Sequence, residues 1–455
     1  MILEFAKGAY NRSDVGLPQA RLQNFYVEKT EGGPSNDARL PRPGLAESYL
    51  VGAGPIRGAY QQKGVFGGDR FFVSGSQVYR ETTLLGAIIG DGPARFAASA
   101  TQLVIVSGGS AYLYDGVSFG IITDPDLPSV SDVTTLAGRF IYTELDTDRF
   151  YWSVVNDAQD IDGLAFATAE GSPDANVAMG VLGDELFFFG QVTTEMWFPT
   201  GDQDAPYQRT QGRRFERGCA SQTSVAVLDN ALFWVGNDRI VYRSGNVPNR
   251  VSTHGIEESL RKCSTIEDCT GFYVTFDGHS FYVLGIPDQA TYAYDVATQE
   301  WAEWTSYGRD TFRVTSCVMV DGQAFMGDSD SGQIWTFDPE RYTDGSDVIT
   351  GLVSCFYPKS SGVEFNFMVG LQAVRGVGNG AAPDPIVEMR YSDDGGREWS
   401  NWRQTSAGKI GEYGVKGIWR KLAQVRNPGR GYEFRITDPV LKVLSYAVIN
   451  EQRFW

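Results

Sequence analysis

The chain has 455 residues, enough for two or three domains with a sizeable core. It carries 39 Lys and Arg residues against 56 Asp and Glu residues, and this net charge of −17 excludes a protein that grips DNA phosphates over most of its surface. The 53 glycines and an aromatic content of 13% predict many strands joined by many turns.

Residues 1–55 show little periodicity. The stretch PSNDARLPRPGL, residues 34–45, contains three prolines, which disfavour a helix and remove donors from a sheet ladder. We predict an extended N-terminal arm here, crossing the surface of its own domain or of a neighbour's. The start of the chain lacks the apolar core of a signal peptide, and no apolar run approaches the ~20 residues needed to span a bilayer.

Residues 56–345 repeat one pattern, two short apolar–aromatic runs separated by a turn. Seven such units start 32, 37, 46, 46, 49 and 44 residues apart. A hairpin of this kind cannot bury its own faces, so an array is stable only when neighbours stack. This spacing is typical of four-stranded blades and predicts an all-β fold with a β-propeller of six to seven blades. The units are FFVSGSQVY from Phe71, LVIVSGGSAYLYDG from Leu103, FIYTELDTDRFYWS from Phe140, LFFFGQVTTEMWFP from Leu186, LFWVGNDRIVYRSG from Leu232, FYVLGIPDQATYAYD from Phe281 and FMGDSDSGQIWTFD from Phe325.

Two segments depart from this repeat. GIEESLRKC, residues 255–263, has acidic residues early and basic residues late, an order that favours the helix dipole, so about two turns of helix are predicted there. Residues 346–455 contain longer, separated strands such as FNFMVGLQAVRG, PIVEMRYS and VLKVLSYAVI. They predict a C-terminal β-sandwich-like domain or a β-meander.

The most specific short motif is SDDGGREW, which fits the Asp-box pattern S-x-D-x-G-x-x-W with Ser392, Asp394, Gly396 and Trp399. In such a turn the aspartate accepts backbone N–H bonds, the glycine permits a positive φ and the tryptophan covers the base. Asp-boxes recur in sialidases, where they are structural. One copy therefore predicts a structural hairpin turn, not sialidase activity.

The strongest enzymatic alternative is a carbohydrate-binding or sialidase-like glycosidase, which needs two carboxylates about 5–9 Å apart. Glu195 and Glu216 lie beside aromatic residues and are the candidate pair. Arg213, Arg214 and Arg217 are candidates for binding a substrate carboxylate. Because acidic residues are plentiful throughout the chain, solvated loop charges are the simpler interpretation.

Other catalytic and metal chemistry has little support. His254 and His279 are the only histidines, too few for a multi-histidine metal site and unpromising for a Ser-His-Asp relay. DSDSG, residues 328–332, resembles the start of a calcium loop but lacks its later glutamate. We therefore predict no catalytic, cofactor or metal site. Five widely spaced cysteines without a CxxC motif predict reduced thiols and folding in a cytoplasm; they are Cys219, Cys263, Cys269, Cys317 and Cys355.

One basic stretch stands out against the acidic whole. Between Lys409 and Arg435 lie seven basic and two acidic residues, a net charge of +5. It is either a solvated strand face or a contact with an acidic neighbour, such as another copy of the propeller or a partner ring. The candidate contact residues are Lys416, Arg420, Lys421, Arg426 and Arg430.

Several segments, taken in order, resemble the packaged-DNA stabilisation proteins of short-tailed bacteriophages, also called tail hub or nozzle proteins. No segment is a strict signature alone, and the combination carries the resemblance. The segments are QNFYVEKTEG leading to RLPRPGL, then RFYWSVVNDAQDIDGLAFATAEGSPD, GDELFFFGQVTTEMWFPTG, RVSTHGIEESLR, FDGHSFYVLGIPDQATYAYDVATQEWAEWTS and WRKLAQVRNPGRGYEFRI.

The resemblance implies a non-enzymatic structural virion protein without a cofactor, assembled in the host bacterial cytoplasm and located in the virion tail. Six copies would form a homohexameric ring below the portal and its adaptor ring, the head-to-tail connector. The ring would carry the tail needle or plug and the tail fibres or spikes. It would retain packaged double-stranded DNA and then let it pass without specific binding. Six chains would carry about −102 formal charges, and a carboxylate-lined lumen would repel DNA phosphates.

Overall fold

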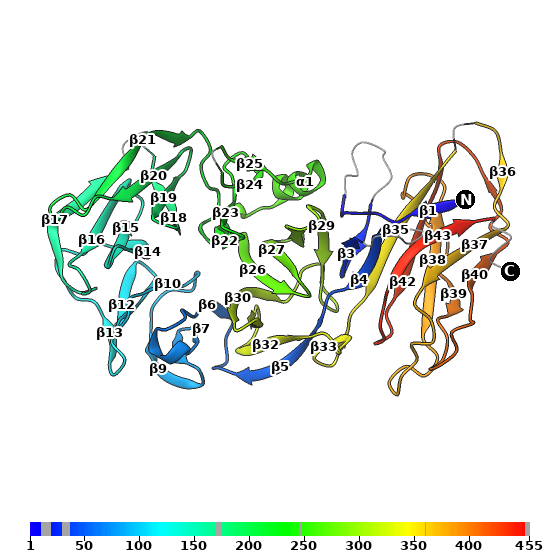
Figure 1. Ribbon diagram of the computed structural model, residues 1–455, viewed down its shortest axis with the longest axis horizontal. Helices are drawn as coiled ribbons and strands as arrows, with labels where there is room; N and C mark the ends of the chain where they lie inside the picture. The colour runs from blue at the N-terminus through cyan, green and yellow to red at the C-terminus, as the bar shows by residue number, and fades with distance from the viewer. Residues whose placement is uncertain (11–19, 30–36, 170–173, 246, 360, 451–455) are drawn as a thin grey trace.

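The computed structural model describes residues 1–10, 20–29, 37–169, 174–245, 247–359 and 361–450 (Figure 1). Nearly all regular structure in these residues is β-strand, as predicted. A propeller occupies one end of the long axis and a sandwich the other, with N-terminal strands between them (Figure 1). Residues 11–19 and 30–36 of the predicted arm lie outside the described residues.

The propeller has seven four-stranded blades. Six are antiparallel meanders of consecutive strands, and the seventh is completed by a strand from the N-terminal part of the chain. Blades one to three are β6 (Ile56–Tyr60), β7 (Phe71–Ser74), β8 (Gln77–Arg80) and β9 (Thr83–Ala87); β10 (Arg95–Ala98), β11 (Leu103–Ser107), β12 (Ser110–Tyr114) and β13 (Phe119–Ile121); and β14 (Val130–Leu136), β15 (Arg139–Glu144), β16 (Arg149–Ser153) and β17 (Ile161–Thr168). Blades four and five are β18 (Asn176–Leu182), β19 (Glu185–Gly190), β20 (Thr194–Pro199) and β21 (Tyr207–Phe215); and β22 (Ala226–Leu228), β23 (Ala231–Val235), β24 (Val241–Arg243) and β25 (Asn249–Arg250). Blades six and seven are β26 (Thr270–Phe276), β27 (His279–Ile286), β28 (Ala290–Asp295) and β29 (Trp301–Trp304); and β30 (Val314–Val320), β31 (Gln323–Asp328), β32 (Gln333–Asp338) and β5 (Gly44–Leu50).

Burial explains why the sequence revealed two strands of each blade. Every residue of β11, β23 and β28 is buried, because neighbouring blades cover both faces of a central strand. The outermost strands are more exposed, and β25 has only two residues, both exposed. The seven predicted hairpins are the second and third strands of the seven blades.

The last blade is closed by a strand from the start of the chain. β5 pairs antiparallel with β32, from Gly44 opposite Asp338 to Leu50 opposite Gln333. The side chain of Leu45 is fully buried there. The first and last segments of the propeller sequence therefore form one sheet. Two short strands, β33 (Thr343–Asp344) and β34 (Asp347–Val348), continue that sheet beyond β5.

The sandwich also uses N-terminal strands. One sheet runs β3-β4-β43-β37-β40, with β1 paired to β43. The other, β35-β42-β38-β39, continues through β2 into β29 of blade six. A small ribbon joins β36 (Glu364–Phe365) to β41 (Gln424–Val425). The remaining strands are β1 (Ile2–Glu4), β2 (Leu22–Gln23), β3 (Phe25–Lys29), β4 (Asp37–Pro41), β35 (Gly351–Pro358), β37 (Met368–Ala373), β38 (Ile386–Ser392), β39 (Arg403–Ser406), β40 (Gly417–Arg420), β42 (Gly429–Ile436) and β43 (Leu444–Ile449).

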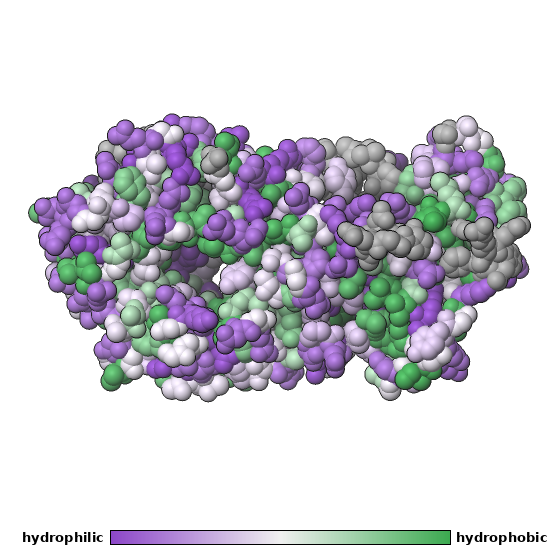
Figure 2. All heavy atoms as spheres, in the orientation of Figure 1, coloured by the Kyte–Doolittle hydropathy of each residue, from purple (hydrophilic) through white to green (hydrophobic). Residues whose placement is uncertain are grey.

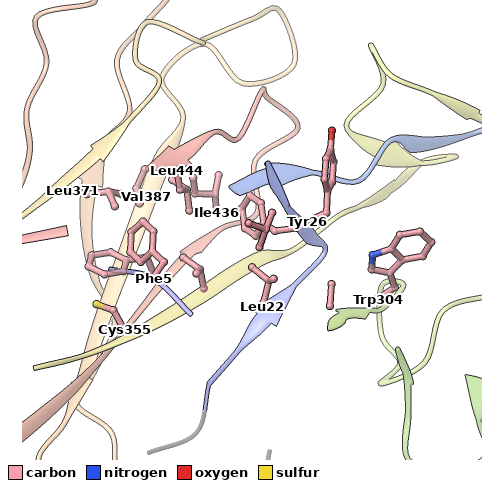
Figure 3. Close-up of a cluster of buried hydrophobic side chains, with 14 of the residues drawn as sticks. Phe5, Leu22, Tyr26, Trp304, Cys355, Leu371, Val387, Ile436 and Leu444 are labelled. Carbon is pink, nitrogen blue, oxygen red and sulfur yellow. The ribbon is translucent and has the colours of Figure 1, made fainter. Parts of the chain in front are cut away.

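One hydrophobic core is shared by the sandwich and blades six and seven. Figure 3 shows Leu22 and Tyr26 of the N-terminal strands between Trp304 of blade six and Ile436 of the sandwich. The described part of the N-terminal segment forms short strands, and it does not lie on a surface as predicted for the arm. Its apolar side chains lie inside this shared core, where Phe25 is fully buried.

Four short helices complete the fold. The predicted helix is α1 (His254–Lys262), which lies between blades five and six and buries Ile256 and Leu260. Its first-turn Glu257 binds Arg250 and accepts a hydrogen bond from Ser252. The other three are single 3-10 turns, η1 (Phe66–Gly68), η2 (Gln222–Ser224) and η3 (Ile266–Asp268).

Candidate interaction surfaces and the joint between the domains

A fully buried ion pair lies where the N-terminal strands pass between the two domains. Arg42, between β4 and β5, binds Asp344 of β33 with two parallel bonds of 2.9 and 2.6 Å. The two side chains are 0% and 1% exposed. Such a bidentate pair fixes geometry as well as charge.

The other donors of Arg42 are also used. Its Nε donates to Asn24 Oδ1 at 2.9 Å, and its terminal nitrogens donate to the carbonyls of Thr305 and Pro43. All five guanidinium N–H groups therefore have an acceptor. We call Asn24, Arg42, Thr305 and Asp344 the joint cluster. It connects blades six and seven to the β2–β3 and β4–β5 connections of the N-terminal segment.

A second polar contact joins blade six to the β3–β4 hairpin. His279, which begins β27, has Nδ1 2.8 Å from Asp295 Oδ2 and Nε2 2.7 Å from Glu28 Oε2. The Tyr26 ring packs against the imidazole, and the Tyr26 hydroxyl donates to Asp277. Burial lowers the pKa of His279, but the hydrogen bonds with Glu28 and Asp295 outweigh it and leave the pKa raised.

This contact predicts a pH-dependent contribution to stability. A histidine whose pKa is raised by folding stabilises the fold fully below its unfolded pKa of about 6.5, and this contribution is lost as pH rises through the folded pKa. Between pH 6 and pH 9, the melting temperature of the wild type should therefore fall relative to that of His279→Gln. Thermal unfolding followed by circular dichroism at both pH values measures the difference, and parallel pH profiles would contradict the prediction.

The Asp-box residues lie in one turn between β38 and β39. The Asp394 carboxylate accepts backbone N–H bonds from Arg397 and Glu398, both at 3.0 Å, and a bond from the Ser392 hydroxyl at 2.7 Å. These bonds lower the pKa of Asp394. Gly396 has φ +96°, and Trp399 Nε1 donates to its carbonyl. The hydrogen bonds of this turn are therefore made among its own residues.

The five candidate contact residues of the basic stretch separate into two groups. Lys416, Arg420, Lys421 and Arg426 are exposed. Arg430 is only 1% exposed: it binds both oxygens of Asp393 and donates to the carbonyls of Leu422 and Gln424. Because these contacts hold its guanidinium inside the sandwich, Arg430 is not available to a partner in this structure.

An exposed aromatic pair lies beside the basic residues. Phe365 and Phe367 are 53% and 69% exposed, and their rings stack 6.3 Å apart. With Arg420 and Lys421 they line a groove of about 500 Å³ at the edge of the sandwich. We call these four residues the sandwich patch. The sequence reading missed the aromatic pair, although two phenylalanines spaced by two in FNF predict one face of a strand.

The candidate carboxylates and arginines form separate structural pairs. Glu195 is buried in β20 and lies 3.5 Å from Arg209, whereas Glu216 is exposed and pairs with Arg214. Arg213 pairs with Glu185, and Arg217 with Asp238. These separate partners favour the structural interpretation of the charges.

The other polar candidates have structural contacts too. The Asp328 carboxylate accepts hydrogen bonds from Arg313 Nε and Trp335 Nε1, both at 2.8 Å. It also accepts bonds from two backbone N–H groups of its own turn. Across the described ranges, no group of three or more His, Cys, Asp or Glu residues could hold a metal ion. All five cysteines are free, and burial raises the pKa of Cys219 to about 12. No helix within the described part of the chain is long and apolar enough to cross a membrane.

The centre of the propeller holds a small cavity. Inner-strand residues of blades one, two, six and seven line a space of about 430 Å³. Figure 2 shows an opening at this position. That volume suits a small molecule and is far too small for a DNA duplex.

The charged and polar residues considered as site candidates make structural contacts within the chain. The sandwich patch, by contrast, is exposed and combines aromatic with basic side chains. The chain is a non-enzymatic structural protein of a virion, as the comparisons with known proteins show. A family model described as the bacteriophage P22 Gp10 β-propeller matches residues 1–342, and one described as the P22 Gp10 β-sandwich matches residues 359–451. The chain belongs to this family, the tail hub proteins of short-tailed phages.

A curated relative and two solved structures are also similar. Tail hub protein gp10 of Salmonella phage P22 is 24% identical over 330 residues, covering 65% of this chain and 70% of that protein. The computationally designed Ika8 protein is 12% identical, with a TM-score of 0.40, over 70% of this chain and 99% of that one. YCF48 from Cyanidioschyzon merolae is 11% identical, with a TM-score of 0.43, over 65% and 99%.

Proposed function

We propose that six copies of this chain form a ring below the portal and adaptor of a short-tailed phage, where the ring retains packaged DNA and provides the channel for genome ejection. The observation that carries the proposal is the presence of both Gp10 family domains, in order, in one chain. The relative is named as a tail hub protein. The ring would also carry the tail needle or plug and the tail fibres or spikes.

Three features of the subunit support this role. The shared core and the joint cluster hold the propeller and the sandwich together, which suits a part that must withstand the pressure of packaged DNA. The propeller cavity is too small for a duplex, which favours a DNA path through the centre of the ring. A chain of net charge −17 does not hold DNA phosphates generally, which suits passage without specific binding.

Phage particles that lack this protein test the proposal. They should package DNA and then lose it, giving empty heads by electron microscopy and DNA that becomes sensitive to added nuclease. Supplying the protein from a plasmid should restore filled, infectious particles. Heads that keep their DNA without the protein would refute the retention role.

A further inference from the structure

The charge of the chain is concentrated in one part of the propeller. Residues 115–204, which include blade three and strands β18 to β20 of blade four, contain 17 Asp or Glu residues and only two basic residues, Arg139 and Arg149; β21, the last strand of blade four, adds three arginines. This segment has a net charge of −15, against −17 for the whole chain. Blades three and four lie at the end of the long axis opposite the sandwich (Figure 1). The molecule thus has an acidic end and, at the sandwich patch, a basic one.

The acidic end also carries a groove whose wall combines polar side chains with exposed apolar ones. Its volume is about 540 Å³, and it lies between β16, β17 and the loop that follows β20. Val154, Val155 and Leu164 in its wall are 43%, 49% and 84% exposed. Asp162 and Asp204 lie in the same wall. We call these five residues the blade groove.

The charged rim of the blade groove is open to a partner. Asp162 and Asp204 make no ion pair with any other described residue. Arg139, the basic residue in the wall, donates to the Ser153 carbonyl at 2.8 Å. Figure 2 shows mainly hydrophilic side chains around a small hydrophobic area at this end.

We propose that the sandwich patch of one copy docks into the blade groove of the next, so that copies of this chain join head to tail. Phe365 and Phe367 would cover the apolar residues of the groove, and Lys421 would approach the aspartates of its rim. Aromatic residues and arginine are enriched at protein–protein interfaces. The opposite charges would steer the encounter and select the register.

Two arguments favour a second copy as the partner and a ring as the product. The patch and the groove lie at opposite ends of the molecule, so one chain cannot join its own two surfaces (Figure 1). Pairing of patch with patch would bring like charges together. A contact between two different surfaces repeats around an axis and closes into a ring when the rotation allows. The inference rests on the proposed ring and specifies its interface.

Single substitutions in the sandwich patch test the contact. Phe367→Ser and Lys421→Glu should each raise the apparent dissociation constant of the ring about tenfold or more, measured by native mass spectrometry and sedimentation over a concentration series. Ile410→Ser is the matched control, because Ile410 is 79% exposed on the same domain and lies outside the patch. It should leave the ring unchanged. Unchanged rings in both patch variants would overturn the inference while leaving the hexamer proposal standing.

A charge exchange tests the pairing itself. Asp162→Lys alone should weaken the ring, and the chain that carries both Asp162→Lys and Lys421→Glu should recover most of the assembly. A double variant no better than the singles would overturn the proposed register. If the wild type forms no ring at all, the proposed function fails first, which is a distinguishable result.

Disulfide cross-linking tests the same contact independently, should one of these variants fold poorly. A chain with Leu164→Cys and Phe367→Cys should form intermolecular disulfides under mild oxidation and run as a ladder of multimers without reductant. Either substitution alone should give no ladder. Because the five native cysteines are free and mostly buried, their background should be small. A double variant that stays monomeric in oxidised gels while rings persist would overturn the contact.

Discussion

Replacing Arg42 with methionine is expected to lower the free energy of unfolding by about 3–5 kcal/mol, because Asp344 would remain buried without its partner. Asn24 Oδ1 and two carbonyl groups would each lose one hydrogen bond in the same step, although Asn24 Oδ1 would keep its bond from the Thr305 backbone N–H. Since the propeller and the sandwich share one core, we expect a single cooperative transition. Urea unfolding, followed by tryptophan fluorescence and circular dichroism together, measures both quantities.

Two further variants distinguish the effect of breaking the buried ion pair from the effect of removing a charge elsewhere. Arg309→Met removes one member of the exposed pair Arg309–Asp330 and should cost no more than about 1 kcal/mol. The double variant Arg42→Met with Asp344→Leu should be more stable than Arg42→Met alone, because no buried charge is left uncompensated. If Arg42→Met costs no more than Arg309→Met, the joint cluster does not hold the domains together.

Deleting residues 1–50 should abolish the folded state. The deletion leaves β32 as an open edge and removes β1, β3 and β4 from the sandwich. It also strips Phe25, Tyr26 and Leu45 from the shared core. The truncated chain should elute as aggregate in size-exclusion chromatography and show no cooperative melt.

A circular permutant is the matched control for this deletion. The chain would be opened between Ala53 and Gly54, in the loop between β5 and β6, and its original ends joined by a short linker. The backbone of Met1 already pairs with that of Ile449, so the N-terminus lies beside the last described strand. The permutant keeps every strand and should melt cooperatively. A deletion that melts as cooperatively as the permutant would show that the N-terminal strands are dispensable.

The sequence predicted the parts of this fold that follow local patterns. The apolar runs that begin at Phe71, Leu232 and Phe281 are central strands, because a strand covered on both faces must be apolar at every position. The helix and the sandwich followed from similar local signals. The weak outer strands, such as β25, gave no pattern to detect.

The rest depended on contacts between distant residues. β5 looked like part of an arm because its partner β32 lies almost 300 residues later in the chain. Arg430 looked like a surface charge because the sequence did not reveal that Asp393 would reach it. The blade groove brings Val154 and Leu164 beside Asp204 from three separate segments. The acidic segment alone could have been found by counting charges along the chain.

Because strand β5 closes the last blade, the subunit can finish folding only after β32 has been synthesised. A ribosome releases β5 early and its partner β32 only after almost 300 further residues, which at 5–20 residues per second is a delay of roughly 15–60 s. Throughout that interval the last blade cannot close, and pairing at such long sequence separation is slow in itself. Only a chain translated past β32 can complete its propeller. An interrupted translation product therefore cannot take a place in the tail.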